Sequence, residues 1–285
     1  MDVMRMFRLD GKIAVVTGGS GLYGAAISEA LCEAGATVLI ASRGLERCEA
    51  KAAELSGKGY AAYGMRLDLA DERSIESFVR QVRTEYGGID ILINNSVSRT
   101  GLADIEETTA EGWSAAQQVN GLGLMLMCRS VVKAMRETGG GRPSRIADKG
   151  GAGTGSGSRG SIVNIASIQG VLGPHFPVYG DTGMTSGIEY TYAKWGMVGM
   201  TKWLAAYYGK HGIRVNSISP GGYNPVGTPN EIPHESFVRS YNERTPLGRM
   251  ADEADLKGAV VYLASEASKY VTGHNLVVDG GWSIW

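Results

Sequence analysis

The sequence predicts an α/β fold of the doubly wound type, in which a seven-stranded parallel sheet carries helices on both faces. Short apolar runs alternate with helix-length segments along the whole 285-residue chain, and this alternation is typical of parallel strands joined by helical crossovers. The apolar runs also lack strict alternation of apolar and polar residues, which predicts strands buried on both faces. No composition break marks a second domain, so residues 1–285 are expected to form one domain.

Seven apolar runs are expected to form the strands. In chain order they are KIAVVTG (12–18), TVLIAS (37–42), AAYGMRL (61–67), DILINNS (90–96), SIVNIAS (161–167), RVNSISP (214–220) and NLVVDGG (275–281).

One segment departs from the strand and helix pattern. Residues 139–160, GGGRPSRIADKGGAGTGSGSRG, are rich in glycine and serine and lack apolar periodicity, which predicts a flexible surface insertion. A loop that grips a phosphate is the alternative, but the segment lacks the Lys-Ser or Lys-Thr ending that such a loop uses.

Composition excludes several classes of partner. The net charge of −1 and the pI near 6.5 argue against nucleic acid or an anionic membrane as the main partner. No apolar run is long enough for a signal peptide or a membrane span, so we expect a cytoplasmic protein. Cys32, Cys48 and Cys128 are odd in number and widely spaced, which fits reduced thiols, and they form no metal-ligand cluster with the four histidines.

The first strand leads directly into a glycine-rich turn, TGGSGLYG at 17–24, and then into a helix. Glycines at such a turn let the backbone approach a pyrophosphate, and the helix N-terminus supplies free N–H groups and partial positive charge. The sequence therefore predicts a dinucleotide site that includes Gly18, Ser20, Gly21, Leu22, Tyr23 and Gly24.

The end of the second strand indicates which dinucleotide binds. An acidic residue there would bond the ribose hydroxyls and repel a 2′-phosphate, but this chain has Ser42 and Arg43. A small hydroxyl beside a guanidinium favours NADP over NAD; the alternative is an Arg43 that faces solvent or stacks on adenine without discriminating. Asp68 and Leu69, after the third strand, are expected near the adenine ring, although Asp68 is equally suited to capping the next helix.

The stretch IEYTYAKWG at 188–196 contains two tyrosines and one lysine. On a helix, residues four apart share a face, so Tyr190 and Lys194 can meet while Tyr192 points elsewhere. A free phenol is a poor base at neutral pH. A nearby ammonium stabilises the phenolate and would tune the pKa of Tyr190 toward the working pH.

These motifs occur in a fixed order: TGGSGLYG, DILINNS, Asn120, IVNIAS, EYTYAK and RVNSISPGG. In that order the chain resembles the short-chain dehydrogenase/reductase family from about Gly11 to the VVDGGW near its end. The resemblance implies a Rossmann-type sheet, a nicotinamide cofactor and hydride transfer between an alcohol and a carbonyl.

The resemblance also implies roles for single residues. Tyr190 would be the catalytic acid and base, and Lys194 would bond the nicotinamide ribose. Ser167, which ends the fifth strand, would hold the substrate oxygen; its alternative role is to cap a turn. Asn120, placed within a helix, would hold a relay water, and its alternative role is that of a satisfied core amide. The remaining cofactor contacts would be Asn95, Ser96, Pro220 and Gly221.

Three features depart from the family pattern. The middle glycine of the usual turn is Leu22 here, and the small pair after the fourth strand is Ser96 and Val97. Ser167 also precedes Tyr190 by 23 positions, about twice the usual gap, while residue 183, four beyond the nearer Tyr179, is glycine. We therefore expect an enlarged active-site loop at 171–189, over the substrate mouth.

The polar segment that follows Pro220 indicates the class of substrate. Its side chains suit a hydroxylated substrate, so an NADP(H)-dependent oxidoreductase of a sugar, sugar acid or polyol is expected. A less polar ketone, a cofactor-binding regulator without turnover, and an epimerase or dehydratase are the alternatives. The candidate substrate contacts are Asn224, Asn230, His234, Arg239 and Tyr241, with Tyr223, Trp195 and Trp282 as stacking rings.

The resemblance implies a homotetramer, with the helices around Asn120 and Tyr190 packed between subunits. The chain ends GGWSIW, and an apolar aromatic at the terminus is unfavourable in water. We expect Trp285 to dock on a neighbouring subunit.

Overall fold

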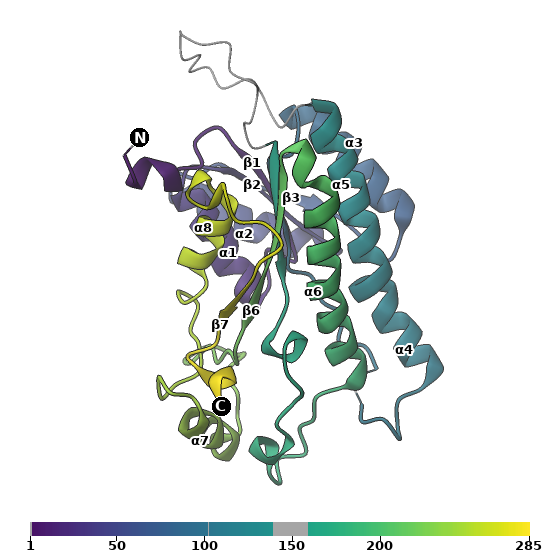
Figure 1. Cartoon of the computed structure of the whole chain (residues 1–285), viewed down its shortest axis with the longest axis vertical. Helices are drawn as coiled ribbons and strands as arrows, with labels where there is room; N and C mark the ends of the chain where they lie inside the picture. The colour runs from purple at the N-terminus through teal and green to yellow at the C-terminus, as the bar shows by residue number, and fades with distance from the viewer. Residues whose placement is uncertain (1, 102, 139–158) are drawn as a thin grey trace.

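A computed structural model describes residues 2–101, 103–138 and 159–285. Its centre is one seven-stranded parallel sheet, as the sequence predicted, and the strand order is β3-β2-β1-β4-β5-β6-β7 (Figure 1). The strands are β1 Ile13–Thr17, β2 Thr37–Ser42, β3 Ala62–Arg66, β4 Ile91–Asn94, β5 Gly160–Ile165, β6 Ile213–Pro220 and β7 Asn275–Val278.

Helices connect the strands and cover the sheet. The α-helices are α1 Leu22–Glu33, α2 Leu45–Gly57, α3 Glu72–Tyr86, α4 Ala110–Gln117, α5 Leu124–Thr138, α6 Ile188–Tyr208, α7 Glu235–Arg244 and α8 Lys257–Ala264.

The sheet has an apolar core on each face, because successive side chains of a strand point to opposite sides. Val15 and Leu39 pack with α3, α5 and α6, whereas Val16 and Ile40 pack with α1, α2 and α8. Figure 1 shows these two helical layers on either side of the strands. All four of these strand residues are fully buried.

The expectation that every strand is buried on both faces is wrong for the two edge strands. In β3 the Tyr63 side chain is 48% exposed, and in β7 Val277 is 37% exposed. Each of these strands has only one neighbour, so the flanking helices cover it less completely.

A chain of buried side-chain hydrogen bonds connects the centre of the sheet to α6. Asn94 and Asn164 lie opposite each other in β4 and β5. The Asn94 amide donates to Asn164 Oδ1 at 2.8 Å, and the Asn164 amide donates to Thr201 Oγ1 at 2.8 Å. All three side chains are buried, so these bonds fix how α6 sits on the sheet.

The predicted insertion and loop have different outcomes. Residues 139–158 lie outside the described residues, and Gly160 already belongs to β5. The loop predicted at 171–189 contains the short helix η4, Phe176–Tyr179, and ends where α6 begins at Ile188.

A third apolar cluster joins this loop to the segment after β6. It contains Ile168, Val178, Phe237, Tyr241, Met250 and Trp282. Val178 from η4, Phe237 from α7 and Trp282 from the C-terminal end therefore share one small core outside the two sheet faces. We call this unit the lid cluster.

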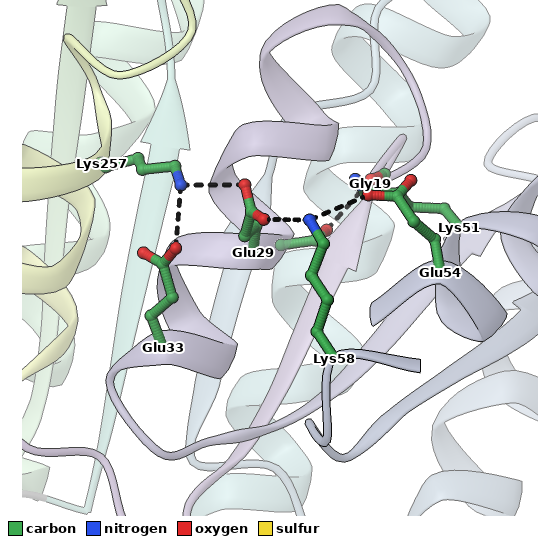
Figure 2. A network of polar contacts seen from close by, with 8 residues as sticks. Gly19, Glu29, Glu33, Lys51, Glu54, Lys58 and Lys257 are labelled. Carbon is green, nitrogen blue, oxygen red and sulfur yellow. Dashed lines mark hydrogen bonds and ion pairs between the residues drawn. The ribbon is translucent and has the colours of Figure 1, made fainter. Parts of the chain in front are cut away.

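Ion pairs tie α1 to α2 and α8. The Glu29 carboxylate accepts hydrogen bonds from Lys58 at 2.6 Å and from Lys257 at 2.9 Å (Figure 2). Lys257 also pairs with Glu33, and Lys58 also pairs with Glu54. The two lysines lower the pKa of Glu29 to about 2, against a smaller opposing effect of burial.

We expect Glu29→Gln to destabilise the protein by about 1 kcal/mol at pH 7, with a smaller loss in acid. The folded-state pKa of Glu29 lies below its unfolded value, so its contribution is complete above pH 5 and disappears as the pH falls toward 2. Urea unfolding of both proteins at pH 7 and pH 3 measures the difference.

Glu49→Gln is the control, because Glu49 is an exposed α2 carboxylate for which the described residues provide no ion pair. An equal loss of stability at both pH values in Glu29→Gln would contradict this assignment.

Candidate active site and cofactor cradle

The strands present their functional residues at one edge of the sheet. Thr17 lies opposite both Ala41 and Asn94, and Asn94 lies opposite Asn164, so the carboxyl ends of β1, β2, β4 and β5 are level. The strand order reverses between β1 and β4, and ligands bind open α/β sheets at such a switch point. The glycine turn and Ser167 both follow strands at this edge.

Tyr190 and Lys194 share one face of α6, as their spacing predicted. Lys194 Nζ lies 5.5 Å from the centre of the Tyr190 ring and donates a hydrogen bond to the Ile165 carbonyl at 2.7 Å. The Lys194 side chain is buried at 4% exposure. Tyr192 points outward at 60% exposure and packs on Trp113.

The pKa of Tyr190 is shifted in the opposite direction to the one expected from the sequence. Burial raises it, while the Ser167 hydroxyl and the charge of Arg99 oppose that rise. Burial also lowers the pKa of Lys194 to about 7, and Arg99 adds to this effect. Since Lys194 is itself desolvated, this chain alone keeps the Tyr190 phenol protonated, which is the form that can donate a proton.

Ser167 follows β5 in extended backbone and is 8% exposed. Its Oγ accepts a hydrogen bond from Gln169 N at 3.1 Å and interacts with the Tyr190 phenol. Ser167 therefore caps a short turn, which was the alternative role considered for it, and it also interacts with Tyr190. The two roles are compatible because a hydroxyl can accept and donate at once.

Asn120 lies in a π-helical turn, Gln118–Gly123, between α4 and α5, and not within a regular helix. Its Oδ1 accepts from Ser98 N at 2.7 Å, and its Nδ2 donates to Ser98 O at 2.8 Å. The side chain is thus a satisfied core amide that fixes the segment after β4. A relay role for Asn120 remains a proposal.

Four glycines, Gly18, Gly19, Gly21 and Gly24, leave the turn after β1 with few side chains. Gly18 has φ +64°, a conformation that favours glycine. A Cβ on Gly24 would lie 2.1 Å from the Gly18 carbonyl, and a Cβ on Gly19 would lie 2.8 Å from Ser28 Oγ. Gly21, the N-cap of α1, provides no side-chain cap, so no described side chain caps the first N–H groups of that helix and they can bind an anion.

The residues after β4 hold this turn in place. Asn95 Nδ2 donates to the Gly18 carbonyl at 3.1 Å. The Thr17 hydroxyl accepts hydrogen bonds from the backbone N–H groups of Asn95 and Ser96, both at 3.1 Å. Asn95 and Ser96 therefore shape the cradle, and Ser96 Oγ would lie 3.1 Å from a Cβ on Gly18.

One buried phenol oxygen in the cradle has no hydrogen-bond partner in the part of the chain that the structure describes. The Tyr23 hydroxyl finds no hydrogen bond among the described residues, although its ring packs on Tyr223 with centroids 4.4 Å apart. Leu22, its neighbour, is 45% exposed and meets solvent. A bare glycine turn, an uncapped helix and an unpaired buried donor together fit a dinucleotide, so this structure accommodates the implied cofactor.

The adenosine end of the predicted site gathers around Cys48. Ser42 Oγ lies 3.0 Å from Cys48 Sγ, and Ser20 Oγ lies 3.8 Å from it. The Arg43 side chain is exposed, and no described residue forms an ion pair with it. Ser20 and Ser42 thus meet at a buried thiol, and Arg43 extends beside them.

The capping role considered for Asp68 is wrong, because Asp71 caps α3 by accepting from Arg73 N at 2.9 Å. Asp68 accepts from Ala70 N at 2.9 Å within its own turn. The carbonyl of Leu69 is so close to the π-helical turn that a Cβ on Gly123 would lie 2.3 Å from it.

The far end of the site follows β6. Gly221 N donates to the Val278 carbonyl at 2.9 Å, directly after Pro220. Two predicted substrate contacts have other functions: the Tyr241 phenol accepts from Gly222 N at 2.6 Å, and Trp282 stacks on the Tyr241 ring at 4.1 Å. Trp282 is only 4% exposed, so both rings are part of the lid cluster.

The other predicted substrate contacts lie outside the lid cluster and are more exposed or line a cavity. Asn224 accepts from Ile232 N at 2.9 Å and lines a cavity of about 490 Å³ beside α7, as does Arg239. Trp195 is 50% exposed on α6. Asn230 is exposed in the segment before α7, and the partly buried His234 immediately precedes that helix.

Sequence reasoning missed three residues at this site and set aside a fourth, Tyr179, because residue 183 is glycine. Arg99 lowers the pKa of both Tyr190 and Lys194 although it belongs to no motif. Glu189 is 1% exposed, and both its carboxylate oxygens lack a partner among the described residues. Gln169 bonds Ser167 through its backbone N–H. Tyr179 interacts with Tyr190, and both Gln169 and Tyr179 precede α6 in the long segment after β5. For Gln169, the sequence signal was its position two residues after Ser167, which places its backbone N–H within reach of the Ser167 hydroxyl.

The described residues contain no group of three or more His, Cys, Asp or Glu side chains arranged to hold a metal ion. Their helices also include none that combines the length and apolarity needed to cross a membrane. Cys32, Cys48 and Cys128 are free thiols and buried.

We expect Gly24→Ala to raise the dissociation constant for NADPH at least tenfold and to destabilise the fold by about 2 kcal/mol, because the added Cβ would collide with the Gly18 carbonyl. Fluorescence titration and thermal unfolding measure the two effects. Gly258→Ala is the matched control, since its Cβ meets no atom within 4 Å in α8, and it should bind NADPH normally. Normal binding by Gly24→Ala would contradict the cradle.

Comparison with known proteins gives consistent matches. The family model described as short chain dehydrogenase matches residues 12–235. D-threitol dehydrogenase of Mycolicibacterium smegmatis is 35% identical, covering 98% of this chain and 95% of that protein. D-arabinitol 2-dehydrogenase (ribulose-forming) of Scheffersomyces stipitis is 30% identical over 100% of this chain and 98% of its own.

A solved structure agrees with the sequence matches. Gluconate 5-dehydrogenase from Burkholderia cenocepacia, in complex with NADP and tartrate, superposes with a TM-score of 0.83 at 27% identity and covers 100% of both chains. With the seven-stranded topology and the Tyr190–Lys194 pair, these matches show that the chain is an oxidoreductase that belongs to the short-chain dehydrogenase/reductase family.

Proposed function

We propose that the protein is an NADP(H)-dependent oxidoreductase that interconverts an alcohol and a carbonyl group on a polyol, sugar or sugar acid. The observation that carries the proposal is the arrangement of Ser167, Tyr190 and Lys194 at the carboxyl edge of the sheet, next to the glycine cradle. The relatives named for threitol, arabinitol and gluconate support the substrate class.

In the reductive direction, each residue has a defined task. Ser167 orients the carbonyl oxygen of the substrate, and the protonated Tyr190 phenol donates its proton to that oxygen. The nicotinamide, when bound, supplies the hydride. Lys194 stands beside the Tyr190 ring with a pKa of about 7, so it can exchange a proton near neutral pH and help restore the phenol.

The preference for NADP over NAD rests on Ser42 and Arg43. Arg43 is a guanidinium without an ion pair among the described residues, at the end of β2. A 2′-phosphate would supply the missing negative charge. The NADP complex of the gluconate 5-dehydrogenase supports the same preference. NAD remains the alternative cofactor.

Compartment and assembly are part of the proposal. Three free buried cysteines favour a reducing compartment, the cytoplasm. A homotetramer is supported by large side chains on the outer face of α6, because Tyr192, Trp195, Trp203 and Tyr207 are each at least 50% exposed. Such a face is unfavourable in water unless another subunit covers it.

We expect Tyr190→Phe to lower the rate of carbonyl reduction about 100-fold or more, because it removes only the proton donor. The assay follows NADPH and NADH oxidation with ketoses, keto sugar acids and simple ketones. Tyr192→Phe is the matched control and should remain active, since that ring faces outward.

Each contrary outcome of this assay has a meaning. Full activity of Tyr190→Phe would contradict the proposed mechanism. Cofactor binding without turnover by the unaltered protein would favour the regulator. A preference for simple ketones would favour the less polar substrate.

We expect removal of Ser283–Trp285 to weaken the assembly, because Ile284 and Trp285 are 74% and 68% exposed on one chain. Among the described residues, Trp285 makes a single polar contact, from its Nε1 to the Arg244 carbonyl at 3.2 Å. Light scattering of both proteins over a range of concentrations measures the change. An unchanged tetramer with normal activity would contradict docking of Trp285 on a neighbour.

A further inference from the structure

A buried serine in α1 holds one carbonyl of the glycine turn. Ser28 is fully buried, and its Oγ donates a hydrogen bond to the Gly19 carbonyl at 3.0 Å. A serine inside a helix often bonds the carbonyl four residues before it, but this hydroxyl reaches nine residues back, out of its own helix. A Cβ on Gly19 would lie 2.8 Å from Ser28 Oγ, so the two residues are in close contact.

The carbonyl that Ser28 holds belongs to the central peptide of a tight turn. The Gly21 N–H donates to the Gly18 carbonyl at 3.1 Å, which closes a four-residue turn whose central peptide joins Gly19 to Ser20. Such a turn has two forms that differ by a flip of this peptide, and the flipped form requires a positive φ at the third residue. Among the described residues only glycines have a positive φ, so Ser20 is in the unflipped form. The hydrogen bond from Ser28 stabilises that form.

The orientation of this peptide also determines where the Ser20 N–H points. The C=O and N–H groups of a trans peptide point in opposite directions. Since the Gly19 carbonyl points toward α1, the Ser20 N–H points away from that helix. No described residue accepts a hydrogen bond from this N–H. Glu29, the residue after Ser28, is anchored by the ion pairs of Figure 2, so α1 is held in place at this point.

The Ser20 N–H lies at the adenosine end of the predicted cofactor site. Ser20 Oγ is 3.8 Å from Cys48 Sγ, and this thiol also contacts the hydroxyl of Ser42 at the end of β2. Backbone N–H groups of glycine-rich turns bind phosphate oxygens. Both nicotinamide cofactors carry such oxygens in the pyrophosphate, and NADP carries more in its 2′-phosphate. A flipped peptide would instead present the partial negative charge of the Gly19 carbonyl to them.

We propose that Ser28 is a positioning residue for the cofactor, which holds the Gly19–Ser20 peptide so that the Ser20 N–H faces a phosphate oxygen. The hydroxyl of Ser28 is too deeply buried to touch the ligand, and it acts only through this peptide. The inference rests on the proposed function, because it requires a cofactor that carries phosphate.

The test measures cofactor binding without turnover. Ser28→Ala removes the donor and should raise the dissociation constant for NADPH, measured by fluorescence titration, about fivefold, as expected for one lost hydrogen bond. Ser28→Cys keeps most of the side-chain volume but offers only a weak donor, so it should weaken binding as well.

Turnover provides a second readout that separates positioning of the cofactor from chemistry. With the best substrate of the Tyr190→Phe assay, the KM for NADPH should rise in Ser28→Ala by the same factor as the dissociation constant. The kcat at saturating NADPH should stay within about twofold, because Ser28 contacts no reacting group.

Binding of NADH identifies which phosphate the Ser20 N–H contacts. An equal loss of affinity for NADH and NADPH in Ser28→Ala would indicate the pyrophosphate, which both cofactors share. A loss confined to NADPH would indicate the 2′-phosphate.

Ser161→Ala is the matched control. Ser161 is 2% exposed at the start of β5, at the opposite edge of the sheet, and its Oγ donates to the Leu263 carbonyl at 2.8 Å. The control variant therefore also loses a buried bond from a serine to a carbonyl. It should lower the melting temperature but leave both dissociation constants unchanged.

The contrary outcomes are distinct. Unchanged binding of both cofactors by Ser28→Ala would overturn the inference, and so would normal binding by Ser28→Cys, because the volume of the side chain would then matter and not its proton. Equal losses of affinity in Ser161→Ala and Ser28→Ala would indicate a general effect of stability and would also overturn it. If the unaltered protein binds neither NADPH nor NADH, the proposed function falls together with this inference. If it binds and reduces a substrate but Ser28→Ala behaves like it, only this inference falls.

Discussion

The hydrogen bonds that run from Asn94 through Asn164 to Thr201 determine the geometry of the active site. They pass through a buried region where an unpaired amide would be costly, so β4, β5 and α6 have one acceptable alignment. A slip of one residue between β4 and β5 would separate the two amides. Thr201 lies two turns along α6 from Lys194, so the same bonds fix where α6 places Tyr190 and Lys194 relative to β5.

Without a bound cofactor, the electrostatics of the site favour reduction of a carbonyl over oxidation of an alcohol. Desolvation dominates at both Tyr190 and Lys194, and it disfavours the charged form of each. A neutral phenol suits proton donation to a carbonyl. Oxidation of an alcohol requires the phenolate, and the positive charge of an oxidised nicotinamide is the group that would stabilise it. The enzyme can therefore work in both directions only if the cofactor supplies part of the electrostatics.

The repeating features of the fold could be predicted from the sequence, because they are local. Seven apolar runs, the glycine turn and the four-residue spacing of Tyr190 and Lys194 each depend on neighbours along the chain. The π-helical turn at Asn120 could not, since it follows from the close approach of Leu69 to Gly123 and the pairing with Ser98. Likewise, Tyr241 and Trp282 looked like ligand contacts until the packing of distant segments placed them in a core.

The lid cluster has a consequence for how this enzyme can change over evolution. Its members come from three segments far apart in the chain, yet they form a core separate from the two on the sheet faces. Substitutions in this small core can change its packing while the two cores on the sheet faces, which fix strand register, stay the same. Because Ile168 follows Ser167 and Tyr241 holds the Gly222 N–H, such changes would be felt at the rim of the site and not in the sheet.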